Sequence, residues 1–454
     1  MSILIKNIGT LETVTGGRFK DMDVLIEGHS VKTVGKCLKA KPERMIDAKG
    51  LVALPGFVNT HHHFYQTFTR NLPDAQNAEL FPWLKFHYRI WQHLEEEDIY
   101  VSSLTALAEL MLTGVTTTTD HLYLYNASAK EHWMENEIKA ASDIGMRFYP
   151  TRGSMSLSEK DGGLPPDDVV QTEESIMAHI DGIISKYHDP SEYSMLRIAL
   201  APCSPFSVTP RLMRETADYA KKKGLLIHTH LAETRDEETF CIEKFGKRPY
   251  EYIKDLGWAG SNAWFAHSIY LNEKEIDDLA ATGSGVSHCP SSNMRLGSGI
   301  AAIPSMLKKG VKVSLGVDGS SSNDSSDFLA EIRQALLLGR VGFGASALTT
   351  KDVLEMGTKG GAAVLNWSDS IGSIEPGKAA DITLWDLNDI SYIGAQSDPV
   401  AALIFSGRRH AAKYVIVNGK VTVEDYKLTG IDEAELIERG MRLSSALWKR
   451  AGLK

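Results

Sequence analysis

Two histidine pairs with the same spacing are the first residues in the sequence that could perform chemistry. His61 and His63 follow the apolar run LVALPGF, and His228 and His230 follow LLI. Side chains alternate faces along a strand, so the two histidines of each pair point the same way, while His62 points to the other face. Two buried imidazoles on one face would cost desolvation energy without a shared partner. The spacing therefore favours a bound metal ion over a structural role.

Two acidic residues complete this candidate site. Asp318 ends the apolar segment KVSLGVD and offers a hard oxygen ligand. Three imidazoles and one carboxylate suit Zn²⁺ or Fe²⁺ and leave room for a water. The expected ligands are His61, His63, His230 and Asp318. Glu233 follows His230 by three residues and could move a proton from such a water, although the alternative is an acid that only stabilises a helix N-terminus.

Eight apolar segments that alternate with helical stretches must position these residues. The first is LVALPGFVNTH, in which residues 51–57 are expected to form the strand, and the last is KVSLGVDGS at 312–320. This alternation predicts an α/β fold with a parallel sheet, and eight units suggest a closed barrel. Each segment is apolar early and ends in a polar residue. Because barrel active sites lie at the carboxyl ends of the strands, we expect the candidate ligands at that mouth.

The two ends of the chain have a different texture. Residues 1–50, 372–387 and 411–428 are rich in β-branched residues and glycine, which is typical of short strands and turns. We therefore expect them to pair into one small sheet domain built from both termini.

Composition limits the function classes. The chain has 454 residues, 43% hydrophobic and 24% charged, which is enough for a large core. A net charge of −9 argues against a partner that is duplex nucleic acid. Four scattered cysteines without a CxxC pair favour a reducing compartment, and the sequence has neither a signal-peptide pattern nor an apolar run long enough for a bilayer. We expect a cytoplasmic protein with a small-molecule partner and no membrane partner.

Ordered motifs along nearly the whole chain resemble the amidohydrolase superfamily, in its branch of deaminases with one metal ion. The motifs are PGFVNTHHH, HTHLAET, AHS, GVDGS and GSIEPGKAADITLWD. The resemblance implies a metal-dependent (β/α)8 TIM barrel at residues 56–374. It implies a β-sandwich domain with a C-terminal helix at residues 1–55 plus 375–454. It also implies one divalent ion per chain, Zn²⁺ before Fe²⁺, and a homo-oligomer.

The superfamily pattern assigns a role to each residue of the candidate site. The implied metal ligands are His61, His63, His230 and Asp318. Glu233 would shuttle protons, His267 would hydrogen-bond the attacking water, and Asp318 would also accept a proton from that water. Taken alone, His267 could equally be a structural histidine at a strand end.

Further motifs narrow the resemblance to the deaminases that convert 8-oxoguanine and water into urate and ammonia. These motifs include NTHHHFYQTFTR, TTTTDHLYLY and SHCPSSNMRLGSGI. Deaminases of isoxanthopterin, guanine or cytosine and hydrolases of hydroxytriazines are the alternatives among enzymes. A non-catalytic barrel that serves as a scaffold is the alternative outside that class, and the retained metal ligands argue against it.

Four residues are candidates for binding the substrate ring: Gln66, Trp83, Arg152 and Cys203. The Gln66 amide can donate hydrogen bonds to a purine edge and accept them from it, and Trp83 can pack against the face of the ring. Arg152 and Cys203 end the third and fourth strands, where either can meet a ring carbonyl. The ordinary alternatives are a loop glutamine, a core aromatic residue and an ion pair of Arg152 with Asp120.

Overall fold

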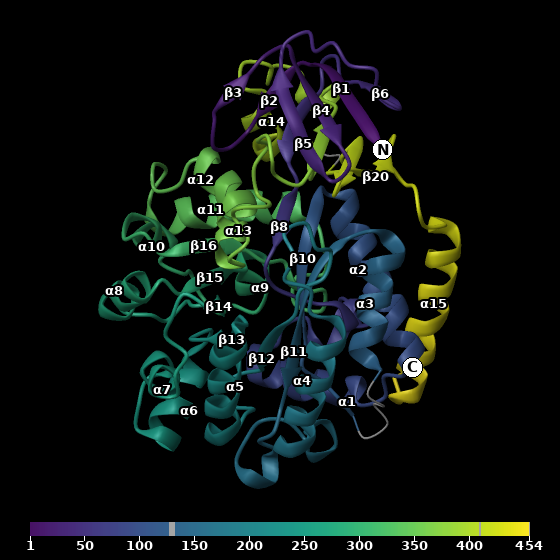
Figure 1. Ribbon diagram of the computed structural model, residues 1–454. Coiled ribbons are helices and arrows are strands. Elements are labelled where there is room, and N and C mark those ends of the chain that lie inside the picture. The colour runs from purple at the N-terminus through teal and green to yellow at the C-terminus, as the bar shows by residue number, and fades with distance from the viewer. Residues whose placement is uncertain (127–131, 408–409, 454) are drawn as a thin grey trace.

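The centre of the computed structural model is a closed barrel of eight parallel strands (Figure 1), and the structure describes residues 1–126, 132–407 and 410–453. The strands follow one another around the barrel in chain order, and the last pairs with the first. They are β8 (Phe57–Asn59), β10 (Val115–Leu122), β11 (Arg147–Ser154), β12 (Ala199–Pro202), β13 (Ile227–Leu231), β14 (Ala263–His267), β15 (Gly285–His288) and β16 (Lys312–Leu315). The predicted α/β fold with a TIM barrel is therefore confirmed.

The prediction that residues 51–57 form the first barrel strand is wrong. Val52–Pro55 is a separate strand, β7, which pairs with β18 (Ile382–Trp385) outside the barrel. The chain changes sheet at Gly56, where a Cβ atom would lie 2.1 Å from Thr116 Oγ1. Both β7 and β8 are buried and apolar, so hydrophobicity does not mark the change between them.

Strands from both ends of the chain form two further sheets at one end of the barrel (Figure 1). The seven-stranded sheet has the order β21-β20-β19-β18-β7-β2-β3, and the four-stranded sheet has the order β5-β4-β1-β6. Buried residues of both sheets, such as Val24 and Ile382, share one hydrophobic core. The remaining strands are β1 (Ser2–Ile8), β2 (Thr10–Glu12), β3 (Arg18–Phe19), β4 (Met22–Glu27), β5 (Ser30–Gly35), β6 (Arg44–Asp47), β9 (His62–His63), β17 (Asp318–Gly319), β19 (Tyr414–Val417), β20 (Lys420–Glu424) and β21 (Lys427–Leu428). The expected contribution of both termini is confirmed, whereas the domain limits at residues 55 and 375 stay a prediction.

Helices cover the outside of the barrel (Figure 1). Within the described chain none of them is long and apolar enough to cross a membrane. The helices are α1 (Leu80–Trp91), α2 (Glu96–Leu112), α3 (Trp133–Ile144), α4 (Glu173–Tyr187), α5 (Pro210–Lys223), α6 (Arg235–Phe245), α7 (Pro249–Asp255), α8 (Glu273–Thr282), α9 (Pro290–Arg295), α10 (Ile303–Lys308), α11 (Phe328–Phe343), α12 (Thr350–Glu355), α13 (Gly361–Val364), α14 (Pro399–Phe405) and α15 (Glu433–Arg450).

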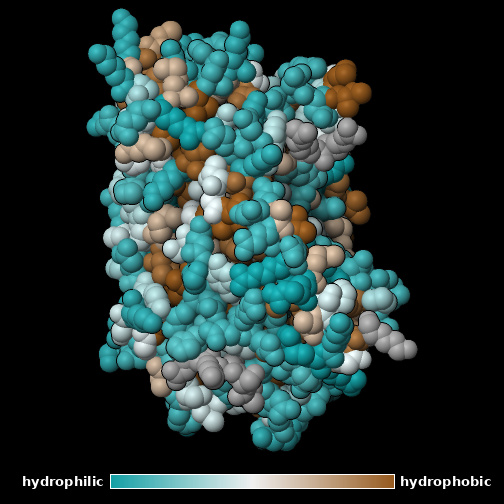
Figure 2. Space-filling view, turned by 90° about the vertical axis from the view of Figure 1, so that its right-hand side faces the viewer, coloured by the Kyte–Doolittle hydropathy of each residue, from teal (hydrophilic) through white to brown (hydrophobic). Residues whose placement is uncertain are grey.

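The last helix, α15, packs against α2 and reaches the segment that follows the histidines. This segment is the short 3₁₀ helix η1 (Phe64–Thr69), and Trp448 Nε1 donates a hydrogen bond of 2.8 Å to the Phe68 carbonyl. An apolar groove between α2 and α15 lies on the face shown in Figure 2, where hydrophobic side chains gather near the centre of the view. The end of the chain thus supports a segment close to the candidate ligands.

A buried ion pair joins the barrel to the terminal sheets. Arg147 begins β11, and its Nε and Nη2 atoms each donate to Asp381 carboxylate oxygens at 3.2 Å. Nη2 also donates to Asn418 Oδ1 at 3.1 Å, and the Asn418 backbone N–H donates to Asp381 at 2.7 Å. Nη1 donates to the Ser194 carbonyl. The guanidinium and the carboxylate both have hydrogen-bond partners, so these buried charges are compensated.

Candidate metal centre

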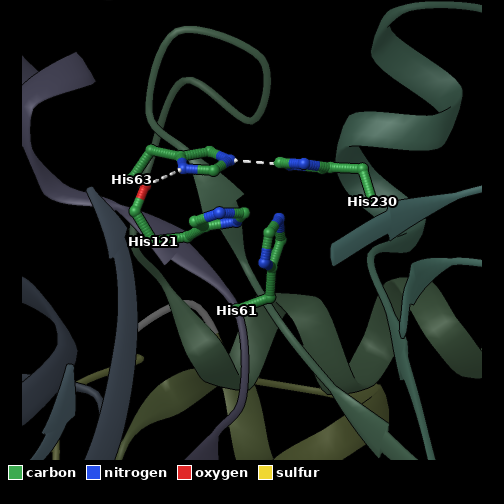
Figure 3. A group of neighbouring side chains, drawn as sticks. All are labelled: His61, His63, His121 and His230. Carbon is green, nitrogen blue, oxygen red and sulfur yellow. Dashed lines mark hydrogen bonds between the residues drawn. The ribbon is translucent and has the colours of Figure 1, made fainter. Parts of the chain in front are cut away.

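The mouth of the barrel brings the four predicted ligands together. His61 and His63 follow β8, His230 lies in β13, and Asp318 begins β17. His63 Nε2 lies 3.1 Å from His230 Nε2 and 3.2 Å from Asp318 Oδ1. His61 Nε2 lies 3.3 Å from the same Asp318 oxygen. Figure 3 shows these three imidazoles, together with that of His121, gathered in one cluster, with His61 and His63 on one segment and His230 on β13.

Backbone carbonyls fix the tautomers of two of these imidazoles. His63 Nδ1 lies 2.8 Å from the His121 carbonyl oxygen, as Figure 3 shows, and His230 Nδ1 lies 2.7 Å from the Cys203 carbonyl oxygen. A carbonyl oxygen can only accept, so each ring carries its proton on Nδ1. The Nε2 atoms are left as lone pairs that face the centre of the cluster.

A chain of two imidazoles fixes the third. His228 Nδ1 donates to the Trp264 carbonyl at 2.9 Å, so His228 Nε2 is an acceptor. His61 Nδ1 lies 2.8 Å from that Nε2 and must therefore be the donor. His61 Nε2 is buried and has no hydrogen-bond partner among the residues that the structure describes. The two histidines of the second HxH pair thus have different roles, because His230 faces the cluster while His228 fixes the orientation of His61.

A divalent cation fits this set of donors. Three lone pairs and a carboxylate oxygen face one another with no proton between them, and two Nε2 atoms at 3.1 Å repel unless a cation separates them. Burial lowers the pKa of His61 well below its usual range and that of His230 to about 3, which keeps both rings neutral. Neutral imidazoles with second nitrogens bonded to carbonyls are the usual ligands of zinc and iron.

Two more histidines border the four predicted ligands. His121 forms a group with His61, His63 and His230, and His267 forms one with His61, His230 and Asp318; within each group the ligand atoms lie within 4.8 Å of one another. His121 Nε2 donates to the Ala201 carbonyl at 2.8 Å. The sequence pattern marks His121 as a polar strand end but assigns it no role.

Glu233 and His267 lie beside the ligands. His267 Nε2 is 3.5 Å from Glu233 Oε2 and 3.9 Å from Asp318 Oδ2. Burial, and next the charge of Asp318, raise the pKa of Glu233 well above its usual value of 4.5. A carboxyl group with a raised pKa can hold a proton near neutral pH and give it to a ligand.

Two buried residues outside the predicted set hold Glu233 and His267. Glu237 accepts the backbone N–H groups of Ala232 and Glu233 at 2.9 Å each, and Asn293 Oδ1 lies 2.9 Å from His267 Nδ1. In the sequence, TRDE at residues 234–237 fits an ordinary helix cap, and Thr234 does cap α6. Sequence reasoning therefore missed Glu237, and no spacing rule points to Asn293.

Four non-glycine residues at the same mouth have left-handed backbone conformations. Ala232, His267, Ser268 and Asp318 adopt positive φ angles of 51°, 67°, 52° and 63°. A non-glycine residue in this region costs about 1–3 kcal/mol and persists only where its surroundings impose it. Asp318 is a candidate ligand, Ala232 precedes Glu233, and Ser268 follows His267. The strained backbone thus lowers the stability of the fold at the residues that position this cluster.

A small cavity opens from the cluster. Its polar wall contains His63, His230, Glu233, His267 and Asp318. Its other walls are mainly apolar and aromatic, and they include Leu80, Trp83, Leu84, Tyr88, Tyr123, Phe206 and Leu296. A flat, partly apolar molecule with polar edges suits such a site.

Three of the four candidate substrate-binding residues line this cavity. Gln66 comes from η1, Trp83 from α1, and Cys203 from the segment after β12. Gln66 Oε1 and Trp83 Nε1 are buried without a hydrogen-bond partner within the described chain. Burial raises the pKa of the Cys203 thiol to about 12, so this residue presents a neutral S–H. One unpaired acceptor and one unpaired donor are thus available to a ligand.

Arg152 lies away from the cavity. Its guanidinium donates to His179 Nδ1 at 3.1 Å and to Gln171 Oε1 at 2.8 Å, and it stacks over the Tyr125 ring at 4.2 Å. These contacts place the side chain on the helix-covered side of β11. Asp120, the partner considered for Arg152, accepts the Phe64 backbone N–H at 2.6 Å instead.

Several known proteins are similar to this chain in sequence or in fold. The model of the Amidohydrolase family matches residues 52–422. An 8-oxoguanine deaminase from Pseudomonas aeruginosa is 46% identical over 401 residues, which cover 88% of each chain. A hydroxydechloroatrazine ethylaminohydrolase from Pseudomonas sp. strain ADP is 36% identical and covers 86% of this chain and 82% of its own.

Among solved structures, the atrazine chlorohydrolase from Arthrobacter aurescens complexed with zinc has a TM-score of 0.91 at 31% identity, over 98% of this chain and 99% of that chain. The similarity thus extends through the barrel and the terminal sheets alike. The resemblance expected from the motifs is confirmed, and the chain belongs to the amidohydrolase family.

Proposed function

We propose that this protein is a metal-dependent hydrolytic deaminase that converts 8-oxoguanine and water into urate and ammonia. The observation that carries the reaction class is the convergence of three neutral imidazole lone pairs and Asp318 beside the buried carboxyl of Glu233. The substrate assignment is supported by the relative named 8-oxoguanine deaminase at 46% identity.

One divalent cation per chain, Zn²⁺ in the first place and Fe²⁺ as the alternative, would be held by four residues. These are His61, His63, His230 and Asp318. When bound, the cation supplies Lewis acidity that polarises a water molecule and lowers its pKa.

The protein's own groups move the protons of the reaction. Glu233 takes one proton from the attacking water and delivers it to the ring nitrogen next to the amino-bearing carbon. Asp318 takes the second proton and passes it to the amino group, which leaves as ammonia when the C–N bond breaks. His267 accepts a hydrogen bond from the water through Nε2, because Asn293 Oδ1 keeps the proton on Nδ1. The ring keeps a carbonyl oxygen and a new N–H.

The cavity walls would orient the ring. Trp83 would lie against its face, while Gln66 and the neutral thiol of Cys203 would face its edges. Arg152 takes no part in this proposal, since its side chain is engaged elsewhere. A hydroxytriazine that loses an alkylamine is the alternative substrate, because the ethylaminohydrolase is 36% identical. The homo-oligomer and the cytoplasmic location stay predictions.

The test is product release on protein of known metal content. Ammonia is measured from 8-oxoguanine, guanine, isoxanthopterin and cytosine, and ethylamine from a hydroxytriazine. We expect the highest kcat/KM for 8-oxoguanine, with urate as the second product. A higher kcat/KM for the triazine would transfer the proposal to that substrate. The absence of any release from metal-loaded protein would contradict deamination altogether.

A further inference from the structure

We infer that Gly319 is a positioning residue for substrate binding, because its missing side chain leaves the space that the Gln66 amide occupies in the cavity. The inference rests on the proposed function and deepens it. Gly319 would act through Gln66, and the Gln66 amide would bind a ring edge that carries an N–H group.

The heavy atoms nearest to the space beside Gly319 belong to Gln66. A Cβ atom on Gly319 would lie 1.8 Å from Gln66 Oε1, 2.2 Å from Cδ and 2.8 Å from Nε2, and these are its three nearest heavy atoms. All three distances are far below van der Waals contact. Because no positive φ is found at Gly319, the backbone itself does not require glycine there.

Other contacts hold the two backbones in place. Gly319 pairs with His63 across β17 and β9, and its N–H donates to Asp318 Oδ1 at 2.8 Å. The Gln66 carbonyl accepts from Ser321 Oγ at 2.9 Å and from Thr69 Oγ1 at 3.1 Å. An alanine at position 319 would therefore displace the Gln66 side chain rather than the backbone of either β17 or η1.

The displaced group is one that a substrate can use. Gln66 is 1% exposed, lines the cavity, and its Oε1 has no partner among the described residues. An unpaired buried acceptor costs free energy, so a ligand that donates to it gains affinity. The oxygen lies against Gly319, next to the ligand Asp318, so it would accept a ring N–H close to the amino-bearing carbon. A lactam N–H beside that carbon, as in 8-oxoguanine, meets this requirement.

A double-mutant cycle separates this role from a structural one. Gly319→Ala should raise KM for the substrate about tenfold and leave kcat within about twofold, because a ground-state contact is lost. Gln66→Ala removes the amide and should raise KM by a similar factor. In the Gln66→Ala background, Gly319→Ala should change KM by less than about twofold, since the space is then free. A full tenfold effect in that background would overturn the inference.

Two controls exclude general effects of the substitution. Gly182→Ala, where an added Cβ meets nothing within 4 Å, should leave KM unchanged. The metal content of Gly319→Ala should equal that of the wild type, and a loss of metal from both Gly319→Ala and the double variant would place the effect on Asp318 and contradict the inference.

A stability cycle gives a readout that needs no activity. If Gly319→Ala melts at a lower temperature or fails to fold, Gln66→Ala should restore the melting temperature of the double variant. A double variant that melts as low as Gly319→Ala would show that Gln66 is not the group that fills the space. A protein without deaminase activity would refute the proposed function, while this cycle would still decide whether Gly319 acts through Gln66.

Discussion

The two ends of the barrel bury charged groups in opposite ways. At the end that faces the terminal sheets, Arg147 and Asp381 pair in two hydrogen bonds, and Asn418 supplies further contacts to both. At the mouth, His61 Nε2 and Gln66 Oε1 are equally buried but have no partner in the described part of the chain. Both ends contain left-handed backbone, at His267 and Asp318 on the mouth side and at Asn418 on the other, and asparagine adopts this conformation more readily than most residues.

This difference separates structural from functional burial. A saturated ion pair fixes how two parts of the fold meet, and each of its groups is needed by the other. Unsaturated lone pairs cost free energy in the protein alone and become favourable only when something binds to them. The mouth is therefore the region where substitution should change chemistry, and the end with Arg147 is the region where it should change stability.

The largest expected effect is a loss of turnover in a protein that still folds. Glu233→Gln keeps the shape of the side chain but cannot shuttle a proton, so turnover should fall by about 10²–10⁴-fold. Steady-state kinetics measures this loss, while metal content and melting temperature should match the wild type. Glu243→Gln, an exposed residue on α6, is the matched control. Turnover near the wild-type value would remove Glu233 from the mechanism.

The next effect is a loss of stability in a protein whose active site is unchanged. Arg147→Met strands the Asp381 carboxylate in the interior and should lower the free energy of unfolding by about 3–5 kcal/mol. Denaturant unfolding measures the loss, and kcat of the folded fraction should not change. Adding Asp381→Asn should recover part of the stability, because the stranded charge is removed. Equal or greater destabilisation in the double variant would show that the pair is not the cause.

The third effect is a change of stability with pH, and it concerns a buried carboxyl group that has hydrogen-bond partners, as Asp381 does, and a raised pKa, as Glu233 does. Glu331 on α11 accepts from the Ser291 backbone N–H and from Asn323 Nδ2 at 3.0 Å each, yet burial raises its pKa to about 8. The folded state thus binds more protons than the unfolded state between pH 4.5 and 8, and this contribution to stability is lost as pH rises.

Glu331→Gln should flatten this pH dependence by up to about 1.4 kcal/mol per pH unit within that range. Melting temperatures at pH 5 and pH 8.5 measure it, with Glu243→Gln as the exposed control. The difference between variant and wild type should shift in favour of the variant at the higher pH. A constant difference at both values would mean that Glu331 is ionised throughout.

The sequence was informative where a rule of periodicity or motif applies. Strand alternation placed His61 and His63 on one face, and strand ends placed Asp318 and Glu233 at the mouth, where the structure has them. Patterns could not separate β7 from β8, because both are buried and apolar around Gly56.

Other features of the site depend on contacts between distant elements. Arg152 ends a strand like the other candidates, but its side chain turns to the outer face, which the pattern of a strand buried on both sides does not reveal. The support of His267 by Asn293 and of His61 by His228 joins residues from different strands and loops. Such pairs appear only when the chain is folded in three dimensions.

The pairing of β7 with β18 has a consequence for how the protein is made. Thr383 Oγ1 donates to the Leu54 carbonyl across 329 residues of chain. At typical ribosomal rates the second strand emerges roughly 15–65 s after the first. The edge of β7 that pairs with β18 is unpaired during that interval, while the barrel strands between β7 and β18 are synthesised. The nascent chain must therefore keep this edge from aggregating until β18 is made. A slow translation step before residue 382 would lengthen the time during which the edge can aggregate.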